Sequence, residues 1–382
     1  MLWNMEIHTK GFVAFYSLLL RIGWGCFFVL YILLPSNLVA QEFGHLTLLF
    51  AGDLMQHQGQ IDAARQIGDL YDYSPCFQYV KEEVSSADIA IANLEVTLAG
   101  EPYRGYPQFS APDEYVQAIK DAGFDVLLTA NNHCLDRRKK GLERTIHVLD
   151  SLKISHVGTY INKEERECHY PLIIQKNGFR IAILAYTYAT NGIEVQSPNV
   201  VNYIDKEQIL QDIAKARTQK ADVIIACMHW GIEYRLLPER QERDMVDWLL
   251  TQGVDHVIGG HPHVLQPMEI RPDKHTAARH VVVYSLGNYI SNMSAPNTDG
   301  GAMVKLELKR IGHIPILADC KYSLVWTSRP SLRGGEGNYI IYPASNPPQI
   351  IQQSESIRLS RFLHSARNLF KKNNIGIEEY FF

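Results

Sequence analysis

The chain has 382 residues, of which 46% are hydrophobic and 20% charged, and its formal net charge at pH 7 is −4. That length allows one large domain or two moderate ones, and the composition is that of an ordinary globular protein. The slight excess of acidic groups argues against a surface that binds nucleic acid. We therefore expect a folded protein whose partners do not include nucleic acid.

Residues 1–40 have the features of a targeting segment and not of a folded domain. Lys10 and Arg21 precede an apolar stretch, Ile22 to Leu34, and Leu38-Val39-Ala40 ends in the small residue that signal peptidase requires. We expect export to the periplasm or cell envelope, with cleavage near Ala40. The alternative is an uncleaved N-terminal membrane anchor, because Gly11 to Leu20 would extend the apolar run.

After residue 40, short apolar runs recur, with helical patterns between several of them. The runs are rich in Val, Ile and Leu without clean alternation, which predicts strands covered on both faces. They occupy residues 45–51, 88–92, 125–130, 180–185, 222–228, 254–258 and 280–284, and the helical patterns occupy 113–122, 141–152, 206–218 and 240–252. This succession predicts an α/β fold, in which ligands bind beyond the carboxyl ends of the strands.

The pattern changes toward the C-terminus. Residues 302–309 alternate as a half-exposed strand should, and 321–327 predict another strand. Residues 328–348 are rich in Gly, Pro, Ser and Asn, which predicts a loop, and 354–373 predict a helix with Arg and Lys on one face. We expect this helix to cover the domain and not to bind a membrane or a polyanion. The main domain is therefore placed at 41–327, with a C-terminal loop and covering helix at 328–382.

Metal-ligating side chains follow the apolar runs. Two imidazoles one residue apart, in Gly260-His261-Pro262-His263, can aim at a shared point. Carboxylates, an amide oxygen and further imidazoles follow other runs, and the whole set is Asp53, Glu95, Asn132, His133, His229, His261 and His263. Singly, several of these residues are explained as well by turns or helix caps. Together they suit Mn, Fe or Zn, and their number favours two ions that share a carboxylate and promote hydrolysis.

Six motifs, taken in order, resemble the CapA family of bacterial poly-γ-glutamate capsule biosynthesis proteins, also called PgsA. They are Gly52-Asp53-Leu54-Met55, Asn93-Leu94-Glu95, Ala130-Asn131-Asn132-His133-Cys134-Leu135-Asp136, His229-Trp230-Gly231-Ile232-Glu233-Tyr234, Gly260-His261-Pro262-His263-Val264-Leu265-Gln266-Pro267 and Ser285-Leu286-Gly287-Asn288. That family in turn resembles a divergent calcineurin-type metallophosphoesterase. The resemblance implies a four-layer αββα sandwich.

The same resemblance implies roles for the residues of the motifs. The ligands of one or two divalent ions (Mn, Fe or Zn) would be Asp53, Glu95, Asn132, His229, His261 and His263. His133 would be the general acid or would steady the transition state. Glu233 and Asn288 are candidates for contacts with the ligands or with the substrate.

Two residues depart from the metallophosphoesterase pattern. Met55 stands where Asp-x-His enzymes have a histidine ligand, so one metal site would be a ligand short. Glu95 replaces an aspartate, which lengthens the arm of the bridging carboxylate. His57 is a candidate replacement for the missing histidine, although its offset does not suit strand-end geometry. A single tightly held ion, with or without a second weak one, is therefore an alternative to two equal ions.

We interpret the sequence as an exported CapA-like protein with a metal-dependent hydrolase site, acting on an anionic polymer or a phosphoester. The alternative is a non-catalytic subunit of a membrane complex that makes or exports capsule polymer, with a structural or vestigial metal site. The missing histidine at Met55 favours the second interpretation. The retained pairs Asn132-His133 and His261-Pro262-His263 favour the enzyme.

Overall fold

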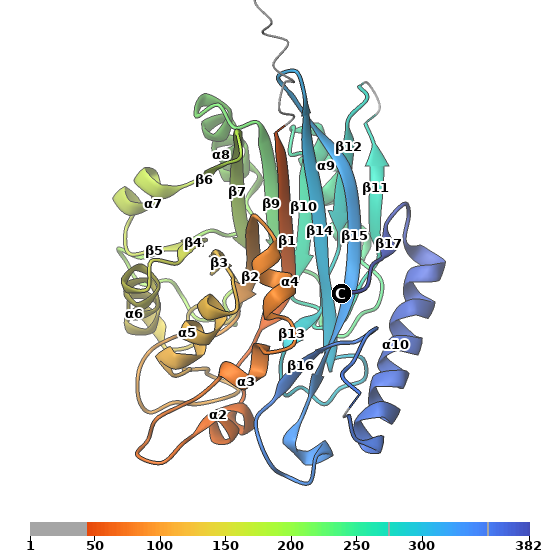
Figure 1. The fold of residues 1–382 in the computed structure, drawn as a ribbon. Coiled ribbons are helices and arrows are strands. Elements are labelled where there is room, and N and C mark those ends of the chain that lie inside the picture. Colours follow the sequence, from red (N-terminus) through yellow and green to blue (C-terminus); the bar gives the residue numbers. More distant parts are fainter. Residues whose placement is uncertain (1–43, 274–275, 350) are drawn as a thin grey trace, which may run out of the picture. The chain divides into compact units, whose positions relative to one another are not determined.

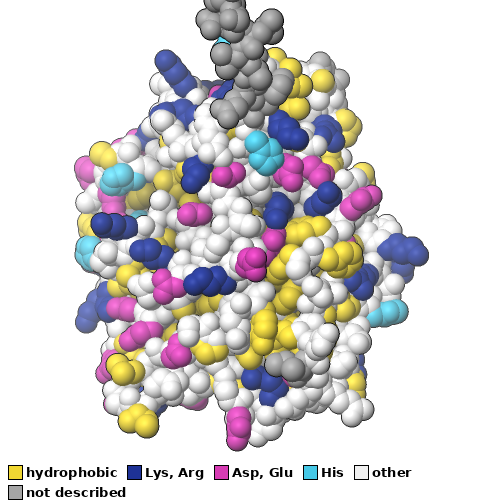
Figure 2. All heavy atoms as spheres, viewed as in Figure 1, with side chains coloured by type: hydrophobic (Ala, Val, Ile, Leu, Met, Phe, Trp, Pro, Cys, Tyr) yellow, Lys and Arg dark blue, Asp and Glu magenta, His cyan; other side chains and the backbone are white. Residues whose placement is uncertain are grey.

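The computed structural model describes residues 44–273, 276–349 and 351–382. Residues 44–382 form one compact unit, and the predicted targeting segment at 1–40 lies outside the described residues. Among the residues described, none of the helices combines the length and hydropathy needed to cross a bilayer. Charged side chains of both signs are interspersed over the face of this unit that Figure 2 shows.

Two β-sheets form the centre of the unit (Figure 1). The nine-stranded sheet has the order β16 (Ile340–Pro343), β15 (Ile314–Ser328), β14 (Gly300–Ile311), β1 (His45–Leu54), β2 (Ile89–Leu94), β3 (Val126–Leu128) and β4 (Ser155–Val157), with β13 (Asn288–Ile290) beside β1 and β17 (Glu378–Glu379) beside β15. The six-stranded sheet has the order β11 (Met268–Pro272), β12 (Arg279–Val283), β10 (His256–Gly260), β9 (Val223–His229), β7 (Phe179–Thr187) and β6 (Leu172–Lys176). A small third sheet pairs β5 (Thr159–Tyr160) with β8 (Val200–Val201).

Helices cover the outer faces of the two large sheets. The first group, on the nine-stranded sheet, contains α2 (Gln58–Ala64), α3 (Ser74–Phe77), α4 (Lys81–Ser86) and α5 (Asp113–Asp121). Two further helices, α6 (Arg138–Ser151) and α7 (Lys163–His169), follow this group in the chain. The second group, α8 (Lys206–Thr218) and α9 (Arg240–Thr251), packs its apolar residues into the same core as the six-stranded sheet. The remaining helical elements are η1 (Pro330–Leu332) and α10 (Gln353–Asn373).

Alternation along β1 shows how the layers stack. Leu48 and Phe50 belong to the core shared with the six-stranded sheet, whereas Leu49 and Ala51 belong to the core shared with α3, α4 and α5. Because successive side chains of a strand point to opposite faces, β1 is buried on both sides. The order helix, sheet, sheet, helix confirms the predicted four-layer α/β sandwich.

A repeated aspartate sets the starting point of the parallel strands. Each of β2, β3, β9 and β10 is preceded by an Asp whose carboxylate accepts a hydrogen bond from a backbone N–H of the adjacent strand. The pairs are Asp88 with Thr47 (2.8 Å), Asp125 with Ala90 (2.8 Å), Asp222 with Arg180 (2.7 Å) and Asp255 with Ile224 (2.8 Å). These contacts fix the register, so the carboxyl ends of the strands come level where ligands bind in such folds.

The C-terminal region differs in part from the sequence prediction. The segment 328–348, predicted as a loop, contributes β16, which pairs antiparallel with β15. The Gly- and Pro-rich composition of the whole segment concealed this short apolar run. The helix predicted at 354–373 corresponds to α10, which buries Leu359, Phe362 and Phe370. The Phe370 ring lies 4.8 Å from that of Tyr322 on β15, so α10 covers the molecule as expected.

Candidate metal centre

The predicted ligands converge because strand register brings the ends of neighbouring strands together. Asp53 on β1 is in register with Asn93 on β2 and with Asn288 on β13. In the other sheet, His229 at the end of β9 is in register with Gly260 at the end of β10. Glu95 follows β2 directly, and His261 and His263 follow β10. The side chains of Asp53, Glu95, His229, His261 and His263 are all buried.

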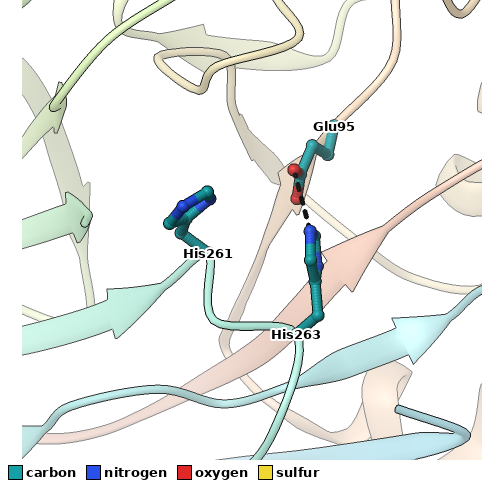
Figure 3. A group of neighbouring side chains, drawn as sticks. All are labelled: Glu95, His261 and His263. Atoms are coloured by element: carbon teal, nitrogen blue, oxygen red, sulfur yellow. Dashed lines mark ion pairs between the residues drawn. The ribbon is translucent and has the colours of Figure 1, made fainter. Parts of the chain in front are cut away.

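Two overlapping groups of these side chains could each hold a metal ion. Glu95, His261 and His263 each offer a ligand atom, and these atoms lie within 4.8 Å of one another (Figure 3). Asp53, Glu95 and His229 form the second group, with the same spacing limit. Glu95 belongs to both groups. This is the arrangement expected of two neighbouring ions that share one carboxylate.

Three buried ligand atoms have no hydrogen-bond partner among the described residues. They are Asp53 Oδ2, Glu95 Oε1 and His261 Nδ1. His263 Nδ1 lies 3.3 Å from Asp53 Oδ2, and His229 Nε2 lies 3.6 Å from Glu95 Oε1. Unpaired polar atoms are rare in protein interiors because each one costs desolvation free energy. Divalent cations held by the two groups would satisfy these atoms, so the residues present fit the metal ions that the resemblance implies.

Burial also sets the protonation states that metal binding requires. Burial lowers the pKa of His261 to about 3 and lowers the pKa of His229 well below its ordinary value, so both rings are neutral at pH 7. Burial raises the pKa of Glu95, and the nearby Asp53 carboxylate raises it further. A cation at this place would relieve both causes of the Glu95 shift.

Asn132 lies beside the second group. Its Oδ1 atom is 2.7 Å from Nε2 of His229, and its Nδ2 atom donates a hydrogen bond to Asn191 at 3.2 Å. The amide oxygen thus faces the ligand cluster, as the sequence prediction required. Among the predicted ligands the structure brings all six together: Asp53, Glu95, Asn132, His229, His261 and His263.

The loop after β10 carries backbone strain. His261 and His263 have positive φ angles of 100° and 58°, which residues with a side chain rarely adopt. Gly259, just before them, has no room for a side chain, because a Cβ atom there would lie 2.1 Å from the backbone oxygen of Tyr284. The strained turn places both imidazoles at the end of the strand. Such strain persists where the surrounding structure holds it and a function requires it.

His133 lies beside the ligands but belongs to neither group. Its Nδ1 atom is 2.7 Å from Oδ2 of Asp136, which also accepts a hydrogen bond from the Phe109 backbone at 2.8 Å. The Phe109 ring packs edge-on against His133, with 4.6 Å between ring centroids. Asp136 was not among the predicted site residues, although its spacing of three residues from His133 was a signal for such a pair.

The departure from the metallophosphoesterase pattern at Met55 remains visible in the structure. Met55 is buried in the apolar core with Tyr73 and Tyr115, so it supplies no ligand. His57 precedes α2, and its Nδ1 atom lies 3.3 Å from both the Asn292 backbone nitrogen and Oε1 of Gln60. It belongs to neither ligand group. Burial lowers the pKa of His57 to about 4. Neither residue therefore supplies the histidine ligand that the Asp-x-His pattern has at the position of Met55.

Asn288 contacts a ligand directly. Its Oδ1 atom lies 3.0 Å from Nδ1 of His263, and its Nδ2 atom donates to the Thr298 backbone oxygen at 2.9 Å. Since Asn288 Oδ1 can only accept, it holds the proton of His263 on Nδ1 and leaves Nε2 for a metal. Of the two roles considered for Asn288, the structure supports that of a partner of the ligand.

Two half-exposed tyrosines lie beside the buried ligands and form the rim of the site. The ring of Tyr188 lies 4.5 Å from His261, and that of Tyr234 lies 6.5 Å from His263. Their exposed fractions are 44% and 46%. Burial raises the pKa of each to about 12, and the charge of the neighbouring Glu233 adds to both shifts. Glu233 is exposed and gives this rim a negative charge.

Comparison with known proteins gives a family match over most of this region. The family model described as "Bacterial capsule synthesis protein PGA_cap" matches residues 47–293. The capsule biosynthesis protein CapA of Bacillus anthracis is 28% identical over 284 residues, covering 71% of this chain and 66% of the relative. The PGA biosynthesis protein CapA of Bacillus subtilis is 28% identical over 278 residues, covering 70% and 69%. The match thus spans about two thirds of the length of these relatives.

Solved structures give more distant matches. An NAD nucleotidase of Haemophilus influenzae has a TM-score of 0.48 and 13% identity, covering 89% of this chain and 64% of that chain. A calcineurin-like phosphoesterase of Bacillus subtilis has a TM-score of 0.44 and 16% identity, covering 85% and 99%. At these scores the likeness is too distant to indicate a function.

Proposed function

This chain belongs to the family of bacterial capsule synthesis proteins, and from that premise we propose that it is a metal-dependent hydrolase of capsule biosynthesis. One observation carries the proposal: three buried ligand atoms, on Asp53, Glu95 and His261, have no hydrogen-bond partner among the described residues and belong to two ligand groups that share Glu95. Stability alone does not explain such a cluster, because buried unpaired carboxylates destabilise a fold. Binding of a cation does.

The chain's own residues would divide the work of hydrolysis. Divalent ions held there would supply Lewis acidity and lower the pKa of water at neutral pH. Asp136 holds the proton of His133 on Nδ1, so Nε2 is the ring atom left for proton transfer. His133 would then protonate the leaving group, which is the usual task of a positioned histidine. The substrate would approach beside the half-exposed Tyr188 and Tyr234, which contact His261 and His263.

The substrate class and the location are parts of the same proposal. The CapA relatives are named for biosynthesis of capsule and of PGA, which supports an anionic polymer such as poly-γ-glutamate, or a phosphoester, as substrate. The predicted targeting segment at 1–40 supports export to the periplasm or cell envelope, with or without an N-terminal anchor. A membrane complex for capsule synthesis is the proposed partner.

A non-catalytic subunit of such a complex is the second candidate. Burial of Met55 in the apolar core favours it, because one metal would lack an imidazole ligand. The contact of His133 with Asp136 favours the enzyme, because a structural metal site has no need of an oriented histidine outside the ligand set.

Turnover assays separate the two candidates. The protein, reconstituted with Mn²⁺, Fe²⁺ or Zn²⁺, would be incubated with p-nitrophenyl phosphate, bis-p-nitrophenyl phosphate and γ-glutamyl p-nitroanilide. The enzyme hypothesis predicts metal-dependent release of nitrophenol or nitroaniline, which the exposed-residue control His147→Ala retains. His133→Ala should slow release of nitroaniline by about 10²–10⁴-fold and slow release of nitrophenol less, because nitrophenolate needs little protonation to leave. Metal binding without turnover of any substrate, together with normal capsule formation by a His133→Ala strain, would contradict the enzyme hypothesis. The result would support the non-catalytic subunit.

A further inference from the structure

Asn93 lies among the candidate ligands but was assigned no role. Its Nδ2 atom donates hydrogen bonds to Asp53 Oδ1 at 2.8 Å and to Glu95 Oε2 at 3.2 Å. The same atom lies 3.4 Å from Nδ1 of His229. Asn93 is buried on β2, in register with Asp53 on β1. One amide nitrogen therefore contacts all three residues of the second ligand group.

The two carboxylates share a pattern that this amide creates. On Asp53, Oδ1 is bonded to Asn93, and Oδ2 has no partner among the described residues. On Glu95, Oε2 is bonded to Asn93, and Oε1 has no partner there. The free oxygens face imidazoles, since His263 lies 3.3 Å from Asp53 Oδ2 and 3.7 Å from Glu95 Oε1. Each carboxylate thus offers one oxygen toward the candidate metal positions.

Asn131 determines which way the Asn93 amide points. Its Nδ2 atom donates to Asn93 Oδ1 at 3.1 Å and to the Leu94 backbone oxygen at 2.8 Å. Its own Oδ1 atom accepts a hydrogen bond from the His133 backbone at 3.1 Å. Because the oxygen of Asn93 is occupied by a donor, its NH₂ group must face the carboxylates. A reversed amide would place two NH₂ groups against each other and its oxygen against two carboxylates.

We propose that Asn93 is a positioning residue of the metal centre: its NH₂ group holds one oxygen of Asp53 and one of Glu95, and Asn131 fixes that orientation. This inference rests on the proposed metal-binding function. It also gives a physical link between the two parts of the site, because Asn131 connects the loop that carries His133 to the carboxylates. Groups that orient ligands in this way contribute to metal affinity without touching the metal.

Metal affinity in four variants tests the assignment. Zn²⁺ and Mn²⁺ affinity would be measured by chelator competition for wild type, Asn93→Ala, Asn131→Ala and the double variant, with melting temperatures recorded for the chelated proteins. Asn199→Ala is the matched control, since the buried Asn199 amide also donates to two oxygens, at 2.9 Å each, outside the ligand cluster. Asn93→Ala should weaken binding about 10–100-fold. Asn131→Ala should weaken it less, and the double variant should match Asn93→Ala, because Asn131 acts through Asn93.

The outcomes separate this inference from the metal centre itself. Wild-type affinity in Asn93→Ala would overturn the inference while the metal centre stands, and independent, additive losses would overturn the role of Asn131. If Asn93→Ala does not fold, Asn131→Ala still decides, because it leaves every ligand and Asn93 in place. Asn93→Asp keeps an oxygen and loses the donor; wild-type affinity in that variant would contradict the proposed role of the NH₂ group. A wild-type protein that binds neither metal would refute the metal centre, and this inference with it.

Discussion

His133 Nδ1 and Asp136 Oδ2 lie 2.7 Å apart, and both side chains are buried. Burial raises the pKa of Asp136, and its hydrogen bond with His133 opposes that rise. The pair is local, three residues apart, yet it orients an imidazole that lies beside the ligands and outside both ligand groups. Under the proposed function, this contact favours the enzyme over the non-catalytic subunit.

Asp136→Asn should slow turnover while metal content stays at the wild-type level. The asparagine oxygen can still accept from the Phe109 backbone, but the variant loses the charge that favours a proton on Nδ1 of His133. We expect kcat to fall about 10²-fold, within the range for general acid–base catalysis. Metal analysis and kcat would be measured on the same sample, with the exposed Asp244→Asn as control. Loss of metal together with activity would show that Asp136 serves the ligands instead.

Glu233→Gln should improve binding of an anionic substrate. Glu233 is exposed at the rim, and its charge reaches Glu95, Tyr188 and Tyr234. Removing the repulsion between one carboxylate and a nearby bound phosphate is worth roughly 1 kcal/mol at low salt. KM for p-nitrophenyl phosphate should therefore fall about fivefold, with kcat retained. The effect should shrink as ionic strength rises. A higher KM in the variant would instead identify Glu233 as a favourable contact to the substrate.

His256 should make the metal-free protein less stable in acid. Burial lowers its pKa to about 3, below an unfolded value of about 6.5. Between these values the unfolded chain binds the additional proton, so the free energy of unfolding falls as pH falls below 6.5. From pH 6.5 to 5 this residue should account for about 2 kcal/mol.

His256→Gln removes the titrating group and keeps an acceptor for the Val281 backbone N–H, which lies 3.0 Å from His256 Nδ1. Urea unfolding at both pH values, in the presence of chelator, should show a smaller loss of stability in this variant. The exposed His147→Gln should behave like wild type. An unchanged pH dependence in His256→Gln would exclude a buried neutral His256.

Asp212→Ala should destabilise the fold without affecting the metal centre. Arg166 donates to both oxygens of Asp212, at 3.0 and 2.8 Å, and both residues are buried. Removing the carboxylate leaves the buried guanidinium without its buried counter-charge, although Arg166 Nε still donates to Asn202 Oδ1 at 2.7 Å. Loss of a buried partner of this kind costs roughly 3–5 kcal/mol. Urea unfolding would be compared with Asp244→Ala, which breaks the exposed pair with Arg240. A loss below about 1 kcal/mol, the usual limit for exposed pairs, would show that Arg166 finds another partner.

The fold and the convergence of the candidate ligands could be predicted because they depend on patterns that the sequence carries directly. Apolar runs such as 222–228 correspond to buried strands, and β9 places His229 where its run ends. Level strand ends then bring together residues that are far apart in the chain, such as Glu95 and His263. Met55 was recognised as a departure from the resemblance, since it lies two residues after Asp53, where Asp-x-His enzymes have a histidine.

Orientation and pairing within the site could not be predicted in this way. The role of Asn93 depends on which end of its amide faces the carboxylates, and the position of Asn131 on another strand end decides that. The contact of Asn288 with His263 depends on β13 pairing beside β1, where the segment is too short for a periodic signal. Likewise, the pairing of β16 with β15 is a tertiary contact that a Gly- and Pro-rich composition does not indicate.

Metal content and turnover of His261→Ala, measured beside wild type, test the central claim most directly. Wild type should retain one or two divalent ions per chain through purification and should lose its turnover when chelated. The only role proposed for His261 is to bind metal, so metal content and turnover should fall together in His261→Ala. The control His147→Ala should retain both. A folded wild-type protein that takes up no Mn²⁺, Fe²⁺ or Zn²⁺, or one that turns over substrate equally well after chelation, would contradict the account.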